Sequence, residues 1–141
     1  MSNKEEYVLS FNETLTDFLL NLAKIIPNSL IGKNIDDIEK AINDPINMYK
    51  FIDVFVARVL KFKPQIDSIL NENMEIDKKN EEFFLRSDYS HESDGDSSII
   101  NKIFEFKNLW KRFDKNNKIV IIQYLQILCE LSQEYFLISD N

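Results

Sequence analysis

The sequence predicts an all-α domain, a bundle of five to six helices around an apolar C-terminal helix. Glycine and proline are scarce, with 2 and 3 of the 141 residues, whereas sheets joined by tight hairpins need glycine at their turns. Apolar residues recur at spacings of three and four, which is the helical period. A chain of this length, 44% hydrophobic, suits one core, so we expect a single domain over residues 1–141.

The first helix is predicted to begin at Ser10 and to end before Pro27. Residues 10–13, Ser-Phe-Asn-Glu, fit a capping box, in which the Ser10 hydroxyl accepts from the Glu13 backbone N–H and the Glu13 side chain reaches back. Seven residues then form one apolar helix face: Phe11, Leu15, Phe18, Leu19, Leu22, Ile25 and Ile26.

Start and stop signals divide the next part of the chain into three helices. Asn34 is predicted to cap a short helix that runs through Ile42. Asp44-Pro45 combines an N-cap residue with proline at the first helical position, which predicts a longer helix. That helix should stop near Pro64, where a fourth, shorter helix begins.

Residues 71–98 are predicted to be an acidic insertion. They hold nine Asp and Glu against three Lys and Arg, which is most of the net charge of −7. Ser87–Ser98 contains no aliphatic residue, so this part is predicted to be a disordered loop. The preceding residues 81–85, Glu-Glu-Phe-Phe-Leu, are a candidate for docking on the bundle.

The last two helices carry the bulkiest apolar side chains. Ser98 is predicted to cap a helix with a broad apolar face that ends at Phe113, and Trp110 is expected to anchor the core. Asp114 is the predicted cap of the last helix, which runs from about Lys115 to Leu137.

The most apolar stretch, residues 118–136, is predicted to be a core helix and not a membrane span, with residues 119–131 at the centre of the bundle. A membrane-spanning helix needs roughly 20 predominantly apolar residues. Two glutamates within the stretch would each cost a few kcal/mol on insertion. Six polar residues interrupt it: Gln123, Gln126, Glu130, Ser132, Gln133 and Glu134.

The sequence offers no apparatus for nucleophilic catalysis. Its one histidine, His91, falls in the acidic loop and is predicted to be a solvated residue rather than a base or a ligand. A reactive thiolate needs nearby positive charge, yet Cys129 stands beside Glu130, so we expect a buried structural thiol. A single cysteine and an N-terminus without a signal-peptide pattern indicate an intracellular, cytoplasmic protein.

No cofactor or metal is expected. Residues 94–96, Asp-Gly-Asp, invite comparison with a calcium loop, but its first and last ligands would then be Ser90 and Asn101 instead of Asp and Glu. Gly32 and Gly95 are isolated, so no phosphate-binding loop is present. The sequence therefore predicts a protein that is not an enzyme.

A basic cluster between residues 102 and 118 is the candidate interaction patch. It suits a phosphate or an acidic partner, although it could equally be the solvated face of an amphipathic helix, partly neutralised by the acidic insertion. Ser93, followed by acidic residues, is a candidate phosphorylation site that would add about −1.5 to −2 charges. The residues of the candidate patch are Lys107, Lys111, Arg112, Lys115 and Lys118.

Residues 109–132, LWKRFDKNNKIVIIQYLQILCELS, resemble a pattern in small helical proteins of nucleocytoplasmic large DNA viruses, the mimivirus-like giants. The likeness lies in Leu109-Trp110, Asn117-Lys118 and Tyr124-Leu125-Gln126, while Ile122 stands where the pattern has a second tryptophan. The resemblance implies a viral, intracellular protein. It brings no catalytic residues.

The function expected from these observations is a non-enzymatic protein–protein interaction module of a large DNA virus: an adaptor, a scaffold or a virion-associated component. One alternative is a Bcl-2-like protein that binds amphipathic helices in a groove, although the chain lacks the Asn-Trp-Gly-Arg motif and its most apolar helix comes last. The other alternative is nucleic-acid association through the basic cluster, against which the net charge of −7 counts.

Self-association or a constitutive partner is also predicted. Short helices have to cover several wide apolar faces, and some aromatic side chains should therefore stay on the surface as a patch, which usually marks an interface. The candidates are Phe55, Phe62, Phe104, Tyr135 and Phe136.

Overall fold

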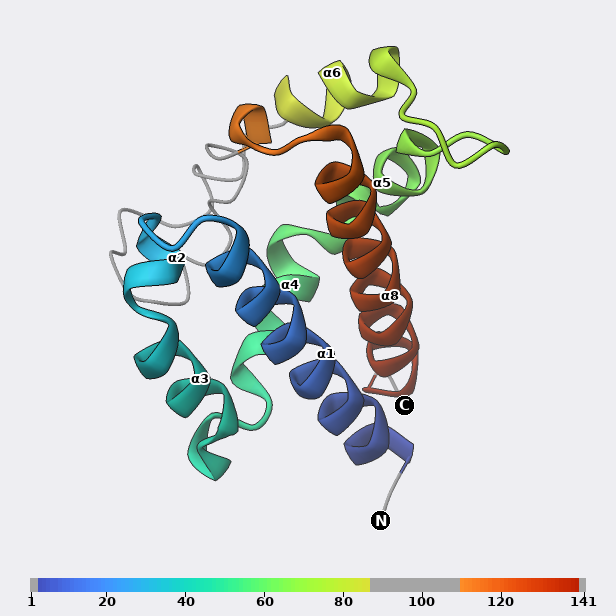
Figure 1. Cartoon of the computed structure of the whole chain (residues 1–141). Helices are drawn as coiled ribbons and strands as arrows, with labels where there is room; N and C mark the ends of the chain where they lie inside the picture. The colour runs from blue at the N-terminus through green and yellow to red at the C-terminus, as the bar shows by residue number, and fades with distance from the viewer. Residues whose placement is uncertain (1–2, 87–109, 140–141) are drawn as a thin grey trace.

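The computed structural model describes residues 3–86 and 110–139. Within these ranges the chain forms seven α-helices (Figure 1). The only β-type pairing among the described residues is an isolated antiparallel bridge between Leu70 and Ile76. The predicted all-α bundle is confirmed, although the described residues alone form seven helices instead of five to six.

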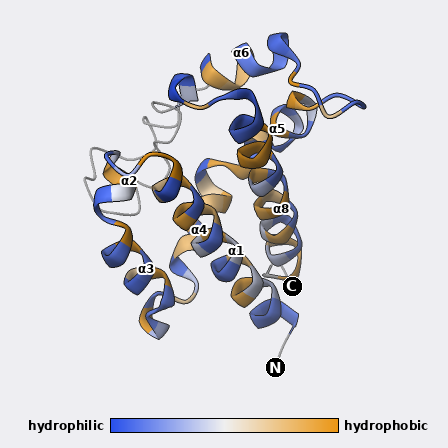
Figure 2. Cartoon of the chain, viewed as in Figure 1, coloured by the Kyte–Doolittle hydropathy of each residue, from blue (hydrophilic) through white to orange (hydrophobic). Residues whose placement is uncertain are grey.

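Two long helices, α1 (Asn3–Ile25) and α8 (Lys115–Ser139), lie side by side and share the most extensive contact of the structure (Figure 1). The shorter α4 (Lys50–Arg58) contacts both of them. Phe11 of α1 meets Phe55 of α4 edge to face, with ring centroids 5.3 Å apart. Hydrophobic and hydrophilic residues alternate along the helices (Figure 2), as expected where each helix buries one face in a shared core.

The first helix starts earlier than predicted. The capping box at Ser10 was a wrong prediction, because α1 already begins at Asn3 and Ser10 lies exposed within it. Val8 stands one turn before Phe11 on the same face and is fully buried. Burial of that extra turn in the core outweighs the local start signal.

A short helix that the sequence did not indicate, α2 (Leu30–Lys33), precedes α3 (Ile35–Asn43). The Ser29 hydroxyl caps α2 by accepting from the Gly32 N–H at 3.0 Å. Asn34 does stand at the start of α3, but its amide donates back to the Leu30 carbonyl at 2.7 Å and makes no cap bond to α3. Both α2 and α3 lie against α1.

The single helix predicted from Pro45 to about Pro64 was wrong. Asp44 caps the first turn as expected, since its carboxylate accepts from the Ile46 N–H at 3.1 Å. The helix is then interrupted at Met48, whose carbonyl accepts a hydrogen bond from Asn12 of α1 at 2.9 Å. The region forms η1, a 3₁₀ helix over Pro45–Asn47, then α4, then η2, a 3₁₀ helix over Leu60–Phe62.

The first part of the acidic insertion, up to Arg86, is folded. A turn links α5 (Lys63–Ile69) to α6 (Lys78–Arg86). In this turn the Asn71 side chain accepts from the N–H groups of Asn73 and Glu75, at 2.9 and 3.0 Å. The expected docking of residues 81–85 is confirmed, since Phe84 is fully buried. The predicted disordered loop, Ser87–Ser98, and the helix predicted to follow it up to residue 109 lie outside the described residues.

The last helix begins where the sequence predicts. Asp114 caps α8 by accepting from the Asn117 N–H at 2.8 Å. Trp110, 1% exposed, is the expected core anchor. The bundle does not cover α8 on every side, because Ile127 is 46% exposed.

No helix within residues 3–86 and 110–139 combines the length and the apolar character that a bilayer span requires.

The aromatic residues expected at the surface divide into two groups. Phe55 and Tyr135 are buried, at 0% and 5% exposure, which contradicts that expectation. Phe136 is 42% exposed, as expected, and Phe62 is half-buried. Phe104 lies outside the described residues. Self-association itself stays a prediction.

Candidate functional site: a groove between α1 and α3

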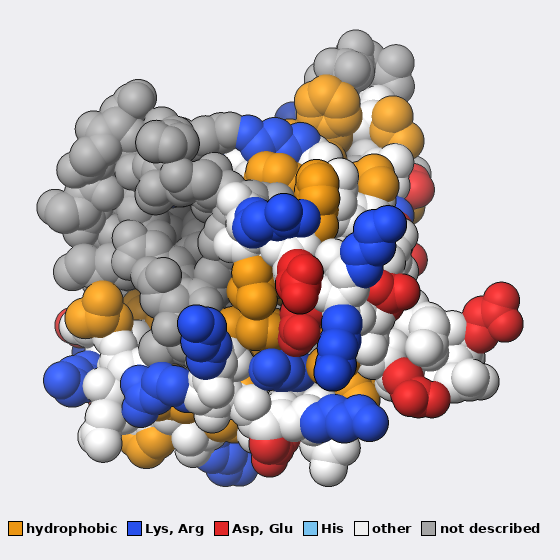
Figure 3. All heavy atoms as spheres, turned by 90° about the horizontal axis from the view of Figure 1, so that it is seen from above, with side chains coloured by type: hydrophobic (Ala, Val, Ile, Leu, Met, Phe, Trp, Pro, Cys, Tyr) orange, Lys and Arg blue, Asp and Glu red, His pale blue; other side chains and the backbone are white. Residues whose placement is uncertain are grey.

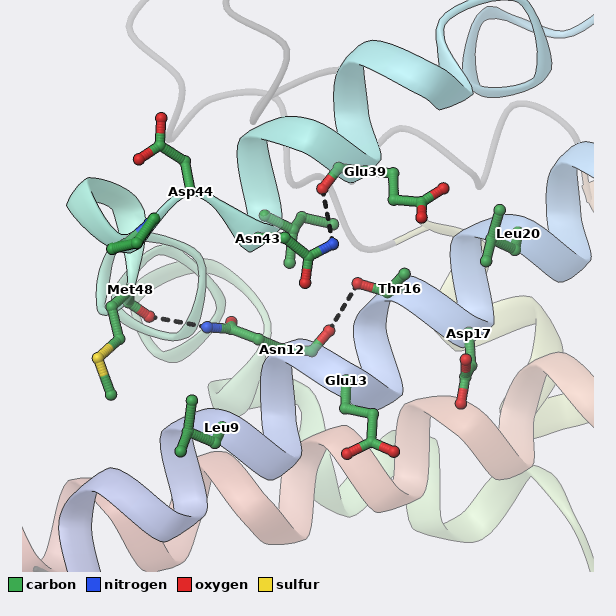
Figure 4. A pocket seen from close by; sticks show the side chains of 12 residues that line it. Leu9, Asn12, Glu13, Thr16, Asp17, Leu20, Glu39, Asn43, Asp44 and Met48 are labelled. Carbon is green, nitrogen blue, oxygen red and sulfur yellow. Dashed lines mark hydrogen bonds between the residues drawn. The ribbon is translucent and has the colours of Figure 1, made fainter. Parts of the chain in front are cut away.

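A groove of about 610 Å³ lies between α1 on one side and the end of α3 with η1 on the other (Figure 4). Cavities of about 300–1,000 Å³ are typical of ligand sites. The lining residues are Leu9, Asn12, Glu13, Thr16, Asp17, Leu20, Glu39, Ile42, Asn43, Asp44, Pro45 and Met48.

The α1 wall is one stripe of side chains spaced three and four residues apart. This spacing places them on one side of a helix, next to the stripe that faces the core. The stripe has a leucine at each end, Leu9 and Leu20, which are 45% and 40% exposed. Between these two leucines lie Asn12, Glu13, Thr16 and Asp17.

The opposite wall is the C-terminal end of α3, where backbone carbonyls lack helical partners. A side-chain amide supplies one of the missing donors, that of the Ala41 carbonyl, and a second amide bonds a carbonyl within the helix. Asn43 donates to the Glu39 carbonyl at 2.8 Å (Figure 4), and Asn47 of η1 donates to the Ala41 carbonyl at 2.9 Å. The Asn47 bond joins η1 to α3 and thereby holds the turn between them in place.

Asn12 joins the two walls. Its amide donates to the Met48 carbonyl, while its own backbone carbonyl accepts from the Thr16 hydroxyl at 2.8 Å (Figure 4). The residue is only 7% exposed, and its side-chain oxygen Oδ1 is buried without a hydrogen-bond donor. Buried polar atoms nearly always have a partner, so this acceptor is an unusual feature of the groove.

The groove is acidic. Four acidic residues line it, Glu13, Asp17, Glu39 and Asp44, and among the described residues no Lys or Arg does. Within the described part of the chain, no ion pair engages Glu13, Asp17 or Glu39. A shallower hollow of about 380 Å³ shares Glu39 and adds Lys40 at its side.

The residues of the basic patch predicted from the sequence lie in different surroundings, and the patch stays a prediction. Lys111, Arg112 and Lys115 are exposed. Lys118 is instead engaged: its ammonium lies 3.5 Å from a Glu81 carboxylate oxygen and 5.4 Å from the centroid of the Trp110 ring. Lys107 lies outside the described residues.

Basic side chains are also not confined to one cluster on the face of the molecule that Figure 3 shows. Figure 3 shows Lys and Arg spread over the end face, with hydrophobic and acidic side chains between them. Neighbouring charges of opposite sign reduce the potential that such a face presents to a polyanion.

The remaining sequence candidates do not form a site among the described residues. Cys129 is fully buried, and burial, with the nearby Asp67 carboxylate, raises the pKa of its thiol to about 12. This confirms a structural thiol. Within residues 3–86 and 110–139, no three His, Cys, Asp or Glu side chains gather as metal ligands do. Ser93, His91 and residues 94–96 lie outside the described residues.

No pattern in the sequence predicted the groove. Asn12 was taken only as part of a capping box, yet it occupies an apolar position of the helical period, four residues after the buried Val8. A polar residue at an apolar position of the helical period is the one signal that could have indicated the role of Asn12 in the groove. The pairing of α1 with α3 leaves no comparable trace in the sequence.

No protein-family model matches the chain, and the comparisons with curated proteins and with solved structures give no match either.

Proposed function

We propose that the protein is a non-enzymatic protein–protein interaction module, an adaptor, scaffold or virion-associated component, and that the α1–α3 groove is its binding site. The observation that carries the proposal is the pair of half-exposed leucines, Leu9 and Leu20, at the two ends of that groove. Grooves between helices commonly receive the apolar face of a partner's helix.

The construction of the groove supports this role. Binding sites are concave, largely apolar, and carry a few placed polar groups. Here the half-buried Met48 adds apolar surface to the two leucines, and Asn12 fixes the distance between the walls through its bond to Met48. A frame held by hydrogen bonds loses little further freedom when a partner binds, which favours affinity.

A Bcl-2-like death suppressor is the second candidate, because it too would hold an amphipathic helix in a groove between helices. An isolated death-motif peptide tests it directly. Binding that depends on Leu9 and Leu20 would favour this candidate, whereas a peptide that fails to bind a protein with an intact groove would remove it.

A viral setting is part of the proposal. Its support is the sequence resemblance of residues 109–132 to small helical proteins of large DNA viruses. Infected cells are therefore the source in which a partner is best sought.

The experiment compares affinity capture by the parent protein with capture by the double variant Leu9→Glu/Leu20→Glu. Glutamate is a good helix former, so these exposed changes preserve α1 while placing charge on both apolar ends of the groove. Leu30→Glu is the matched control, since Leu30 is 54% exposed on α2 and does not line the groove.

A partner identified by mass spectrometry is then purified and its affinity is measured for each variant. We expect the double variant to lose binding by at least roughly 10-fold, since charge is placed against an apolar contact, and the control to bind like the parent. A partner that binds all three proteins equally, with helical circular dichroism unchanged, would refute a role for the groove.

A further inference from the structure

The charge of the groove identifies the chemistry of its partner. Glu13 and Asp17 stand four residues apart on one face of α1, where like charges destabilise a helix. Glu39 adds a third carboxylate from the opposite wall, and Asp44, which caps η1, is a fourth acidic residue there (Figure 4). In the described part of the chain no cation pairs with Glu13, Asp17 or Glu39, so the free protein keeps this repulsion and a cationic partner would relieve it.

The apolar contacts set the shape of that partner. Leu9 and Leu20 are eleven residues apart in α1, which corresponds to about 16 Å along the helix axis, or about three turns. A partner helix lying along the groove would therefore place apolar side chains about three turns apart. Its intervening residues on the same face would meet the carboxylates.

The unpaired acceptor of Asn12, like the carboxylates, favours a partner that carries hydrogen-bond donors. Asn12 Oδ1 is buried and has no donor. Lys and Arg side chains bring three and five N–H donors and no acceptor, whereas a carboxylate would add only acceptors. An occupant rich in N–H groups thus suits a groove that is rich in acceptors.

We propose that the α1–α3 groove binds a cationic amphipathic helix of about three turns, with leucine-like side chains against Leu9 and Leu20 and Lys or Arg side chains against Glu13, Asp17 and Glu39. This inference rests on the proposed function and specifies its partner.

The test uses three synthetic peptides of roughly 14 residues, a length that gives about four helical turns. The first is an amphipathic helix with Leu at the two ends of one face and Lys between them. The second has Glu in place of every Lys, and the third has the composition of the first in an order that destroys the amphipathic face. Binding of labelled peptide is measured by fluorescence anisotropy at low and at physiological salt.

Two variants of the protein locate the binding site. Glu13→Gln/Asp17→Asn removes two charges from the groove, and Glu72→Gln/Glu75→Gln removes two exposed charges from the turn between α5 and α6. Both changes raise the net charge equally and nearly keep the shape of the side chains. They therefore separate a contact in the groove from general attraction to an acidic protein.

We expect the Lys peptide to bind the parent protein and the turn variant alike, and to bind the groove variant roughly 3- to 10-fold more weakly, as for two exposed ion pairs. Binding should weaken further with salt. The Glu peptide and the scrambled peptide should bind at least 10-fold more weakly than the Lys peptide.

Equal weakening by both double variants would overturn the inference, because attraction would then follow net charge alone. Equal binding of the three peptides would also overturn it. A third outcome is that none of the peptides binds, while the native partner binds Leu9→Glu/Leu20→Glu more weakly than the parent protein. The inference of a cationic helix is then refuted and the proposed function stands. If the native partner binds Leu9→Glu/Leu20→Glu as tightly as it binds the parent protein, the proposed function itself is refuted.

Discussion

The indole N–H of Trp110 donates a hydrogen bond of 2.8 Å to a carboxylate oxygen of Glu81, a residue 29 positions earlier in the chain. The same oxygen lies 3.5 Å from the ammonium of Lys118. Phe84, one turn after Glu81, meets the Trp110 ring edge to face at 5.9 Å. Together these contacts attach α6 to the start of α8, and they give the Glu81 carboxylate its partners beside the core.

Trp110→Ala should lower the free energy of unfolding by about 3–5 kcal/mol, because a fully buried ring is replaced by a cavity. Trp110→Phe is the control: it keeps much of the ring but removes the N–H donor to Glu81, and should cost less. Urea unfolding followed by circular dichroism measures both. A cost for Trp110→Ala within about 1 kcal/mol would mean that α6 and α8 are not held together through this residue.

Asn12→Ala should destabilise the protein by about 1–3 kcal/mol, because the Met48 carbonyl loses its donor where water has little access. Asn43→Ala provides the comparison. That residue also bonds a backbone carbonyl, that of Glu39, but the bond is exposed, so water replaces the lost donor at little cost. Equal losses for the two variants, measured by urea unfolding, would show that the Asn12 bond has no special role in joining the groove walls.

Gly32→Ala should destabilise the turn between α1 and α2. A Cβ atom at this position would lie 2.4 Å from the Pro27 carbonyl oxygen and 2.6 Å from that of Ile26, so backbone atoms would have to move. Overpacking of this kind costs about 1–3 kcal/mol. Lys33→Ala, at the exposed neighbouring position, should be nearly neutral. Thermal unfolding measures the stability of both variants. A Gly32→Ala protein as stable as the parent would exclude close approach of Gly32 to the backbone of Ile26 and Pro27.

Cys129 should make stability depend on alkaline pH. Its thiol pKa is about 12 in the folded protein, against about 8.5 in an unfolded chain. Between these values the folded state keeps a proton that the unfolded state releases. The contribution to stability is therefore fully present below about pH 8.5 and is lost as pH rises toward 12, by at most about 1.4 kcal/mol per pH unit.

The measurement is the difference in unfolding free energy between the parent and Cys129→Ala at a series of pH values. The cavity left by the substitution costs the same at every pH, and other alkaline groups affect both proteins alike. The difference should be constant below about pH 8.5 and should shrink above it. A difference that stays constant up to pH 10 would contradict a buried, protonated thiol.

Self-association is the last expectation. Three large apolar side chains of α8, those of Ile127, Phe136 and Leu137, are 46%, 42% and 54% exposed. Exposed apolar surface of this kind often marks an interface, and symmetric dimers are the commonest soluble oligomers. Sedimentation should show mass rising with concentration through the micromolar range. A single 16.7 kDa species at every concentration would exclude a homo-oligomer.

Local signals in the sequence determined the helical class and several helix boundaries. Asp114 caps α8, Asp44 caps η1 and Trp110 is buried, all as the sequence predicts. Each of these features depends on an apolar period or on a cap that acts within a few residues of its own position. Such preferences are already present in the unfolded chain.

Only the tertiary structure decided where α1 begins, where the helix after Asp44 breaks, and that a groove exists. Val8 extends α1 because α1 and α8 bury it together. The helix after Asp44 breaks at Met48, where the backbone carbonyl accepts a hydrogen bond from Asn12, 36 residues away in the sequence. The acidic groove follows from placing Glu13 and Asp17 opposite Glu39. Contacts between distant segments stabilise the fold only once both segments are in place. No local pattern in the sequence could therefore encode them.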